Sequence, residues 1–162
     1  MCLGLFAGTA SAQAVSEQIV VAGAVKTSLT LKVDDLKAFP ATQIESVAVT
    51  RRADGKELPT TLRGVRLTSV LERAGMEGST DRNEWKHTVV LATATDGYQV
   101  VFSWPELSNT DVGAGVLVVF ERDGQPLADR EGRIALVSAR DLRTGPRSVR
   151  WLARLDVRVV KE

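Results

Sequence analysis

The chain has 162 residues, of which 44% are hydrophobic and 25% are charged, a composition typical of one globular domain with its own core. The formal net charge of +1 argues against a general nucleic-acid or membrane-surface binder, because such proteins carry a basic excess on one face. Aromatic residues make up only 5%, so each Trp and Tyr calls for a specific explanation.

The N-terminus predicts an export signal. A short apolar run, Cys2–Gly8, is followed by small residues and then by Ala12-Gln13-Ala14, an A-x-A cleavage pattern. The run is too short to span a membrane, and its many small residues argue against the alternative of a buried strand. We expect cleavage after Ala14, leaving residues 15–162 as a single periplasmic domain.

Cysteine and histidine are almost absent. Cys2, inside the predicted signal, is the only cysteine, and His87 is the only histidine. The mature protein is therefore expected to have no disulfide, no thiolate metal ligand and no cysteine nucleophile. A zinc site or a histidine-based triad would need partners that the chain lacks.

The first half of the chain predicts strands and two short helices. Asp34 is expected to cap a helix that Pro40 ends, and Leu67–Ala74 has helical spacing with Gly75 as its stop. The polar segment Arg51–Lys56 contains an Asp-Gly turn signal, which predicts a hairpin whose second strand reaches Leu62. The other strands are expected at Gln18–Val25, Ser28–Val33 and Glu45–Thr50.

In the second half, a polar loop is expected at Gly78–Glu84 and a helical turn at Pro105–Leu107. The predicted strands are Trp85–Ala94, Tyr98–Phe102, Val116–Phe120, Ile134–Val137 and Val149–Val159. Alternation in the last of them turns Val149 and Trp151 inward and Arg150 outward. Together the elements predict an α+β domain with a strand-rich mixed sheet and no dinucleotide-binding motif.

The stretch Ser138–Trp151 carries four arginines around a turn at Gly145-Pro146. A guanidinium presents a rigid fork of donors, so several of them in one loop suit a planar or anionic ligand. The alternative is that these arginines are solvated loop charges.

Six segments resemble, in order and spacing, the sulfite-oxidase-like molybdopterin-binding domain family. The resemblance runs in order across almost the whole mature chain, roughly from Leu29 to Val159, and the segments are Leu29–Leu36, Leu62–Leu67, Val70–Gly75, Ala94–Tyr98, Asp123–Leu127 and Gly145–Leu152. The resemblance implies the fold of that family and a pterin or molybdopterin ligand.

The chain departs from the catalytic members of that family. Those members have a molybdenum-binding cysteine after the strand equivalent to Glu45–Thr50, and here no cysteine is present. Hydroxyl and guanidinium groups do not replace a soft thiolate. The chain therefore resembles the small, exported, cysteine-less branch, some members of which bind free pterins and act as sensory partners of membrane proteins. For this chain the resemblance implies a pterin, with tetrahydropterin as one candidate, or molybdopterin.

A pterin pocket needs carboxylates for the ring donors, guanidinium groups for the acceptors and an aromatic face for stacking. The candidate carboxylates in this chain are Asp96, Glu106 and Asp141, and the candidate aromatic faces are Tyr98 and Trp104. The candidate hydrogen-bond donors are Arg140, Arg147, Arg150 and Ser148. Of the arginines, Arg147 is expected to lie over the cleft, contact a neutral reduced pterin directly and pack against no core residue.

Several candidates have a simpler explanation. Asp96 also suits a tight turn with Gly97, Glu106 also suits the first turn of a helix, and Tyr98 also suits a core position. Three functions remain open at this stage. They are a non-catalytic, exported pterin-binding partner of a membrane signalling protein, a molybdopterin-dependent oxidoreductase or a subunit of one, and an interaction module without a ligand.

Overall fold

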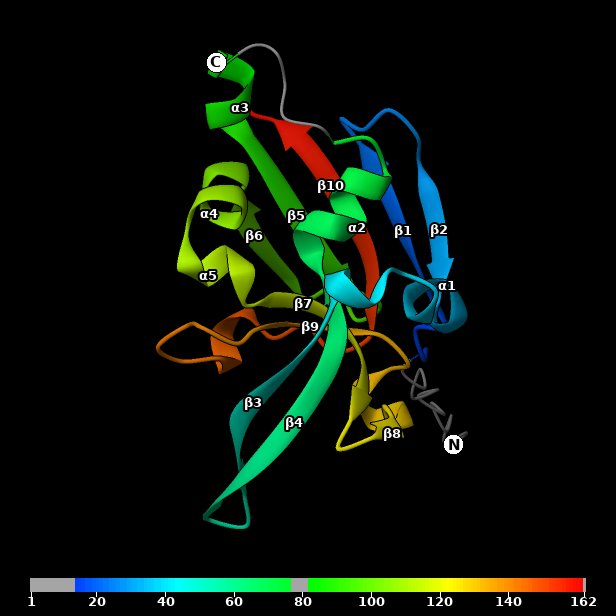
Figure 1. The fold of residues 1–162 in the computed structure, drawn as a ribbon, viewed down its shortest axis with the longest axis vertical. Helices are drawn as coiled ribbons and strands as arrows, with labels where there is room; N and C mark the ends of the chain where they lie inside the picture. The colour runs from blue at the N-terminus through cyan, green and yellow to red at the C-terminus, as the bar shows by residue number, and fades with distance from the viewer. Residues whose placement is uncertain (1–13, 77–81, 162) are drawn as a thin grey trace, which may run out of the picture.

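A computed structural model describes residues 14–76 and 82–161, so the predicted signal and most of the loop at Gly78–Glu84 lie outside the described residues. Two five-stranded sheets form the molecule (Figure 1). In the first sheet β1 and β10 are parallel and all other neighbours are antiparallel. Its strands, in spatial order, are β2 (Leu29–Lys32), β1 (Gln18–Gly23), β10 (Leu152–Val159), β5 (Thr88–Ala94) and β6 (Gln99–Ser103).

The second sheet is wholly antiparallel. Its strands are β3 (Ile44–Ala53), β4 (Lys56–Arg66), β7 (Val116–Arg122), β8 (Gln125–Pro126) and β9 (Ala135–Ser138). The β3–β4 hairpin extends away from the rest of the molecule in Figure 1, because β4 pairs with β7 only over its second half, from Leu62 onward. The predicted mixed sheet is thus confirmed, with a second sheet beside it.

Short helices connect the strands. They are α1 (Val33–Lys37), α2 (Leu67–Arg73), α3 (Arg82–His87), α4 (Trp104–Asn109) and α5 (Asp111–Ala114), with 3-10 turns η1 (Ala41–Gln43), η2 (Asp129–Glu131) and η3 (Gly145–Arg147). None of the helices within the described residues is long and apolar enough to cross a membrane.

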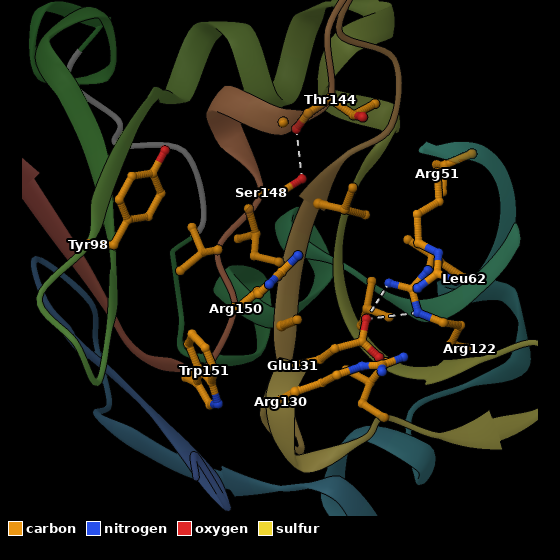
Figure 2. Close-up of a pocket in the computed structure, with 18 of the residues that line it drawn as sticks. Arg51, Leu62, Tyr98, Arg122, Arg130, Glu131, Thr144, Ser148, Arg150 and Trp151 are labelled. Atoms are coloured by element: carbon orange, nitrogen blue, oxygen red, sulfur yellow. Dashed lines mark hydrogen bonds and ion pairs between the residues drawn. The ribbon is translucent and has the colours of Figure 1, made fainter. Parts of the chain in front are cut away.

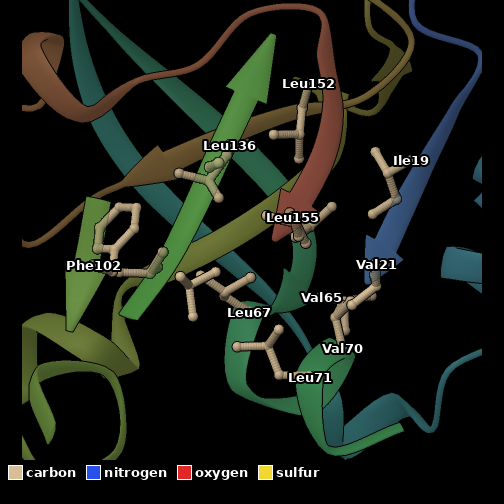
Figure 3. Packing of buried hydrophobic residues seen from close by; sticks show 14 of the residues in the cluster. Ile19, Val21, Val65, Leu67, Val70, Leu71, Phe102, Leu136, Leu152 and Leu155 are labelled. Carbon is tan, nitrogen blue, oxygen red and sulfur yellow. The ribbon is translucent and has the colours of Figure 1, made fainter. Parts of the chain in front are cut away.

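The main hydrophobic core draws side chains from both sheets and from α2. In Figure 3, Val21 of β1, Val65 of β4 and Val70 of α2 lie together in this cluster, and all three are fully buried. A second, smaller cluster includes Leu117 and Val119 of β7. The strand β7 is apolar without alternation because one face enters the main core and the other enters this second cluster.

Several predicted elements are confirmed. The β3–β4 hairpin turns at Asp54-Gly55, where both residues have positive φ, and α2 ends before Gly75, whose φ is 80°. The cap of α1 differs from the prediction. Its N-cap is Lys32, whose backbone N–H donates to Asp35 Oδ2 at 2.8 Å, so a carboxylate in the first turn caps the helix from inside.

The starts of two strands were predicted three residues too early. Trp85 and His87 belong to α3, and β5 begins only at Thr88. The last strand begins at Leu152, because Trp151 has a φ of 51° and turns the chain. A register shift between Leu152 and Arg154 then brings both Leu152 and Leu155 into the core. Trp151 therefore lies outside the core, whereas the alternation of the sequence predicts that it points inward.

Candidate functional site

A cleft of about 630 Å³ lies where the segment after β9 passes the outer face of the second sheet (Figure 2). Its floor is apolar and consists of Val49, Leu62, Val119, Leu127 and Val137, most of which belong to the second hydrophobic cluster. The volume lies within the range of about 300–1,000 Å³ usual for small-molecule sites. The second cluster therefore serves both as packing for β7 and as the base of a cleft.

Charged side chains surround this floor. Four arginines line the cleft, Arg51, Arg122, Arg130 and Arg150, against two carboxylates, Asp96 and Glu131. Arg122 and Glu131 neutralise each other, with a shortest N–O distance of 2.5 Å.

The other three guanidinium groups have no hydrogen-bond or ion-pair partner in the part of the chain that the structure describes. In Figure 2 the Arg150 side chain lies between Tyr98 and the Arg51–Arg122 side of the cleft. Unpaired guanidinium groups gathered around one cleft favour an anionic or acceptor-rich ligand.

Two aromatic side chains stand on the other side of the cleft, Tyr98 and Trp151. Each is held by its polar atom: Tyr98 Oη donates to the Pro146 carbonyl at 2.6 Å, and Trp151 Nε1 donates to the Asp129 carbonyl at 2.8 Å. The Trp151 N–H also donates to the Glu131 carbonyl at 2.8 Å, which fixes the turned backbone. These contacts hold the two rings at the cleft, and aromatic rings of this kind can stack on a flat ligand.

Four of the residues singled out from the sequence line this cleft: Asp96, Tyr98, Ser148 and Arg150. Asp96 also makes the expected turn, since its Oδ1 accepts from the Tyr98 N–H at 2.9 Å. Ser148 Oγ donates to the Thr144 carbonyl at 2.7 Å within the same wall.

Three other predicted residues do not line the cleft but bind one another. Arg147 donates to Asp141 through Nε at 2.7 Å and Nη2 at 2.5 Å, and to Glu106 Oε1 through Nη1 at 2.9 Å. Ser138 Oγ completes the shell by donating to Asp141 at 2.8 Å. The hydrogen bond from Arg147 holds the pKa of Asp141 below its usual value, and the same bond raises the pKa of Arg147.

The expected packing of Arg147 is therefore corrected. Its guanidinium carbon lies 4.7 Å from the ring centroid of Phe102, a fully buried residue of β6. With its donors directed at two carboxylates and one face over a core ring, Arg147 packs against the core, contrary to our prediction. Arg147 and Arg150 are close in sequence, and the sequence does not indicate that only Arg147 packs against the core.

Arg140 and Trp104 also lie elsewhere. Arg140 donates to the Asp111 carbonyl at 3.0 Å, and Trp104 is 5% exposed at the start of α4. Trp104 borders a separate cavity of about 260 Å³, together with Trp85 and Met76. Neither residue lines the main cleft, so Trp104 does not supply its aromatic face.

Sequence reasoning missed the arginines on the far side of the cleft. Arg51 was assigned to a polar turn, whereas it lies in β3, and Arg130 was given no role. The continuous apolar run of β7 was the available signal, because a strand buried on both faces requires a second layer near it.

The polar and stacking groups of the cleft include aromatic, guanidinium and carboxylate groups. The cleft is lined in part by Val49, Thr50 and Arg51. In the catalytic members of the family that the sequence resembles, this region carries the cysteine. Its described lining offers no thiolate or imidazole, and no group of three or more potential metal ligands occurs in the described residues. Aromatic, guanidinium and carboxylate groups, by contrast, match the faces and edges of a pterin ring.

Two comparisons with known proteins identify the family and the fold of the chain. The model of the oxidoreductase molybdopterin binding domain family matches residues 8–161. The crystal structure of the sulfane dehydrogenase SoxCD from Paracoccus pantotrophus is similar with a TM-score of 0.65 and 17% sequence identity. The match covers 90% of this chain but 39% of the SoxCD chain, and at this identity it shows a shared fold alone.

No curated protein gives a significant match to the chain. The family match nevertheless extends over almost the whole sequence and agrees with the shared fold, which confirms the resemblance predicted from the six segments. The chain belongs to the oxidoreductase molybdopterin binding domain family.

Proposed function

We propose that this cleft binds a pterin carrying a negatively charged substituent, and that the chain does so without catalysing a reaction. The observation that carries the proposal is the set of three unpaired guanidinium groups, from Arg51, Arg130 and Arg150, around an apolar floor. Tyr98 and Trp151 offer faces for the ring, and Asp96 and Glu131 offer acceptors for its amino edge. Family membership supports a ligand of the pterin type.

The charge of the cleft refines the ligand expected from the sequence. We expected a neutral reduced pterin, but four arginines against two carboxylates leave a positive cleft. An anionic group beside the ring gains charge-assisted hydrogen bonds that a neutral pterin lacks. Molybdopterin, which carries a phosphate, and pterins with an acidic side chain both belong to this class.

Calorimetric titration with 6-carboxypterin tests the proposal, with unsubstituted pterin as the uncharged comparison. Arg150→Ala should weaken carboxypterin binding roughly ten- to a hundredfold, because a hydrogen bond to a charged group contributes about 1.5–3 kcal/mol. Arg158→Ala is the control, since Arg158 is exposed on β10 and pairs with Asp156 at 3.1 Å. Equal affinities of wild type and Arg150→Ala would move the site elsewhere.

The absence of catalysis is a proposal with its own test. It rests on the cleft lining, which offers no soft ligand for molybdenum among the described residues. The alternative is a molybdopterin-dependent oxidoreductase or a subunit of one, and family membership supports it equally. Elemental analysis of protein purified from its native compartment distinguishes the two, since stoichiometric molybdenum would refute a non-catalytic role.

We also propose that the protein is exported and acts as a ligand-loaded partner of a periplasmic domain of a membrane signalling protein. The cleavage pattern Ala12-Gln13-Ala14 and the resemblance to the small exported branch support this proposal. The intact mass of periplasmic protein should correspond to a start at Val15, and a retained Cys2 would count against export. A pull-down with and without carboxypterin should recover an envelope protein, and repeated failure would refute the partner.

A further inference from the structure

The segment Thr144–Trp151 forms one wall of the cleft and supplies six of its lining residues, Thr144, Gly145, Ser148, Val149, Arg150 and Trp151. Its regular backbone pairing is limited. Val149 exchanges two hydrogen bonds of 2.8 Å with Leu136, and Trp151 is held by its N–H donating to the Glu131 carbonyl at 2.8 Å and its carbonyl accepting from the Thr95 N–H at 3.0 Å. Ser148 N–H donates only within its own turn, to the Gly145 carbonyl at 3.1 Å. Before this segment the chain leaves β9 and passes through Leu142, which is fully exposed. Among the described residues, the part of the wall from Thr144 to Ser148 has no backbone–backbone hydrogen bond to another element, so the position of this part depends on side-chain contacts.

Arg147 provides most of these contacts. It joins its own turn, η3, to Asp141 at the start of the loop and to Glu106 on α4. Its guanidinium also lies over Phe102 of β6, so the contacts reach the main core. Tyr98 adds a second attachment through its hydrogen bond to the Pro146 carbonyl at 2.6 Å.

We propose that Arg147 is a positioning residue for the pterin: it holds the Thr144–Trp151 wall, and with it Arg150, at the cleft without touching the ligand. This inference rests on the proposed function of the cleft. Arg147 is directed at Asp141, Glu106 and Phe102 and does not line the cleft, whereas Arg150 lines it and has no partner among the described residues. The two arginines therefore have separate tasks in the recognition of one ligand.

Loss of Arg147 should act through the population of the binding-competent wall. The apparent dissociation constant equals the intrinsic one divided by the fraction of molecules in the binding-competent arrangement. If the wall of Arg147→Ala is in place in about one molecule in ten, affinity for 6-carboxypterin falls about tenfold. Arg147→Lys keeps one ion pair but loses the bidentate fork, so its affinity should lie between those of wild type and Arg147→Ala.

The salt dependence of binding separates positioning from contact. A cation that touches the anionic ligand contributes to the loss of affinity with rising salt, because salt screens their attraction. Titration with 6-carboxypterin at several sodium chloride concentrations should therefore give Arg147→Ala the wild-type salt slope and a weaker affinity. Arg150→Ala should show both a weaker affinity and a shallower slope, and Arg158→Ala should match wild type.

Hydrogen exchange provides a readout that is independent of the ligand. In Arg147→Ala the amides of Ser148 and Val149 should exchange faster, while amides in β5 keep their protection. Glu106→Gln removes one charged partner of Arg147 and leaves the Asp141 pair. It should therefore speed exchange at the same amides and weaken carboxypterin binding about two- to threefold. This variant replaces Arg147→Ala if Arg147→Ala does not fold. These measurements use the full chain as purified.

Two outcomes would overturn the inference. Arg147→Ala with wild-type affinity would show that the wall does not need Arg147, and Arg147→Ala with the shallow slope of Arg150→Ala would show direct contact. If wild type binds no carboxypterin, the proposed function fails, and hydrogen exchange alone then decides the inference. Unchanged exchange at Ser148 and Val149 would refute it in that case.

Discussion

Arg147 and Arg150 lie three residues apart and differ in every contact. Arg147 has two carboxylate partners and a core ring beneath it, and its side chain is 25% exposed. Arg150 is exposed, lines the cleft and has no side-chain partner within the described residues. The groups that the fold places opposite a guanidinium therefore decide whether it stabilises the protein or remains available to a ligand.

The same contrast extends to the aromatic neighbours of the two arginines. Phe102, below Arg147, is fully buried in the main core. Trp151, beside Arg150, is held outside the core by a positive φ and a hydrogen bond to the Asp129 carbonyl. One side of the loop is thus integrated into the core, and the other lines the open cleft.

The largest effect is expected from removing the ring below Arg147. Phe102→Ala should destabilise the protein by about 3–5 kcal/mol, because it leaves a cavity in the core and removes the surface on which Arg147 lies. Chemical denaturation measures the free energy of unfolding. Val101→Ala is a matched control on the same strand, since Val101 is 53% exposed, and it should change stability by less than about 0.5 kcal/mol. A cost for Phe102→Ala no larger than that of the control would mean that this side of the loop is not anchored in the core.

Substitution of the two arginines themselves should separate stability from binding. Arg147→Ala should lower the free energy of unfolding by about 1–3 kcal/mol, because Asp141 and Glu106 lose their charged partner. Arg150→Ala should change it by less than about 0.5 kcal/mol, since no contact in the described protein is lost. Denaturation curves measured side by side give both values, and equal values for the two variants would remove the distinction between them.

The smallest effect is a pH dependence. The folded-state pKa of Asp141 is lowered, chiefly by its hydrogen bond from Arg147, relative to an unfolded-state value of about 3.9. The unfolded protein therefore binds more protons near that pH, so this stabilisation is present above it and is lost as the pH falls through the folded pKa.

Asp141→Asn lacks this titration. The difference in unfolding free energy between wild type and Asp141→Asn should therefore be greatest near pH 7 and shrink below about pH 4. Some acid sensitivity should persist in the variant, because the pKa of Asp156 is also lowered, chiefly by its hydrogen bond from Arg154. A constant difference between pH 7 and pH 3 would contradict the assigned Asp141–Arg147 pairing.

Much of the fold could be predicted from the sequence, because local signals are strong in this chain. Alternation, the Asp54-Gly55 turn and the spacing of α2 with Gly75 all correspond to observed elements. The boundary at Trp151 could not be predicted, because nothing local indicates that a tryptophan will adopt a positive φ. Contacts distant in sequence, such as Trp151 with Asp129 and Glu131, impose that conformation.

The candidate site could be predicted only in part for the same reason. The arginine-rich loop predicted from the sequence supplies part of the cleft wall, and Tyr98, Ser148 and Arg150 do line the cleft. The division between Arg147 and Arg150 depends on Glu106, which is 41 residues away in sequence from Arg147. Arg51 and Arg130 reach the cleft because the second sheet folds beneath it, and a linear pattern does not contain that arrangement.

The most direct test of the central claim is a map of amide chemical shifts during titration of the protein with 6-carboxypterin. We predict saturable shifts at the cleft, at Asp96–Tyr98, at Glu131 and at Ser148–Trp151, with no shift around Trp85 and Trp104 at the separate cavity. Shifts confined to the Trp85–Trp104 cavity, or no saturable shift anywhere, would contradict the assignment of this cleft as a site for an anionic pterin.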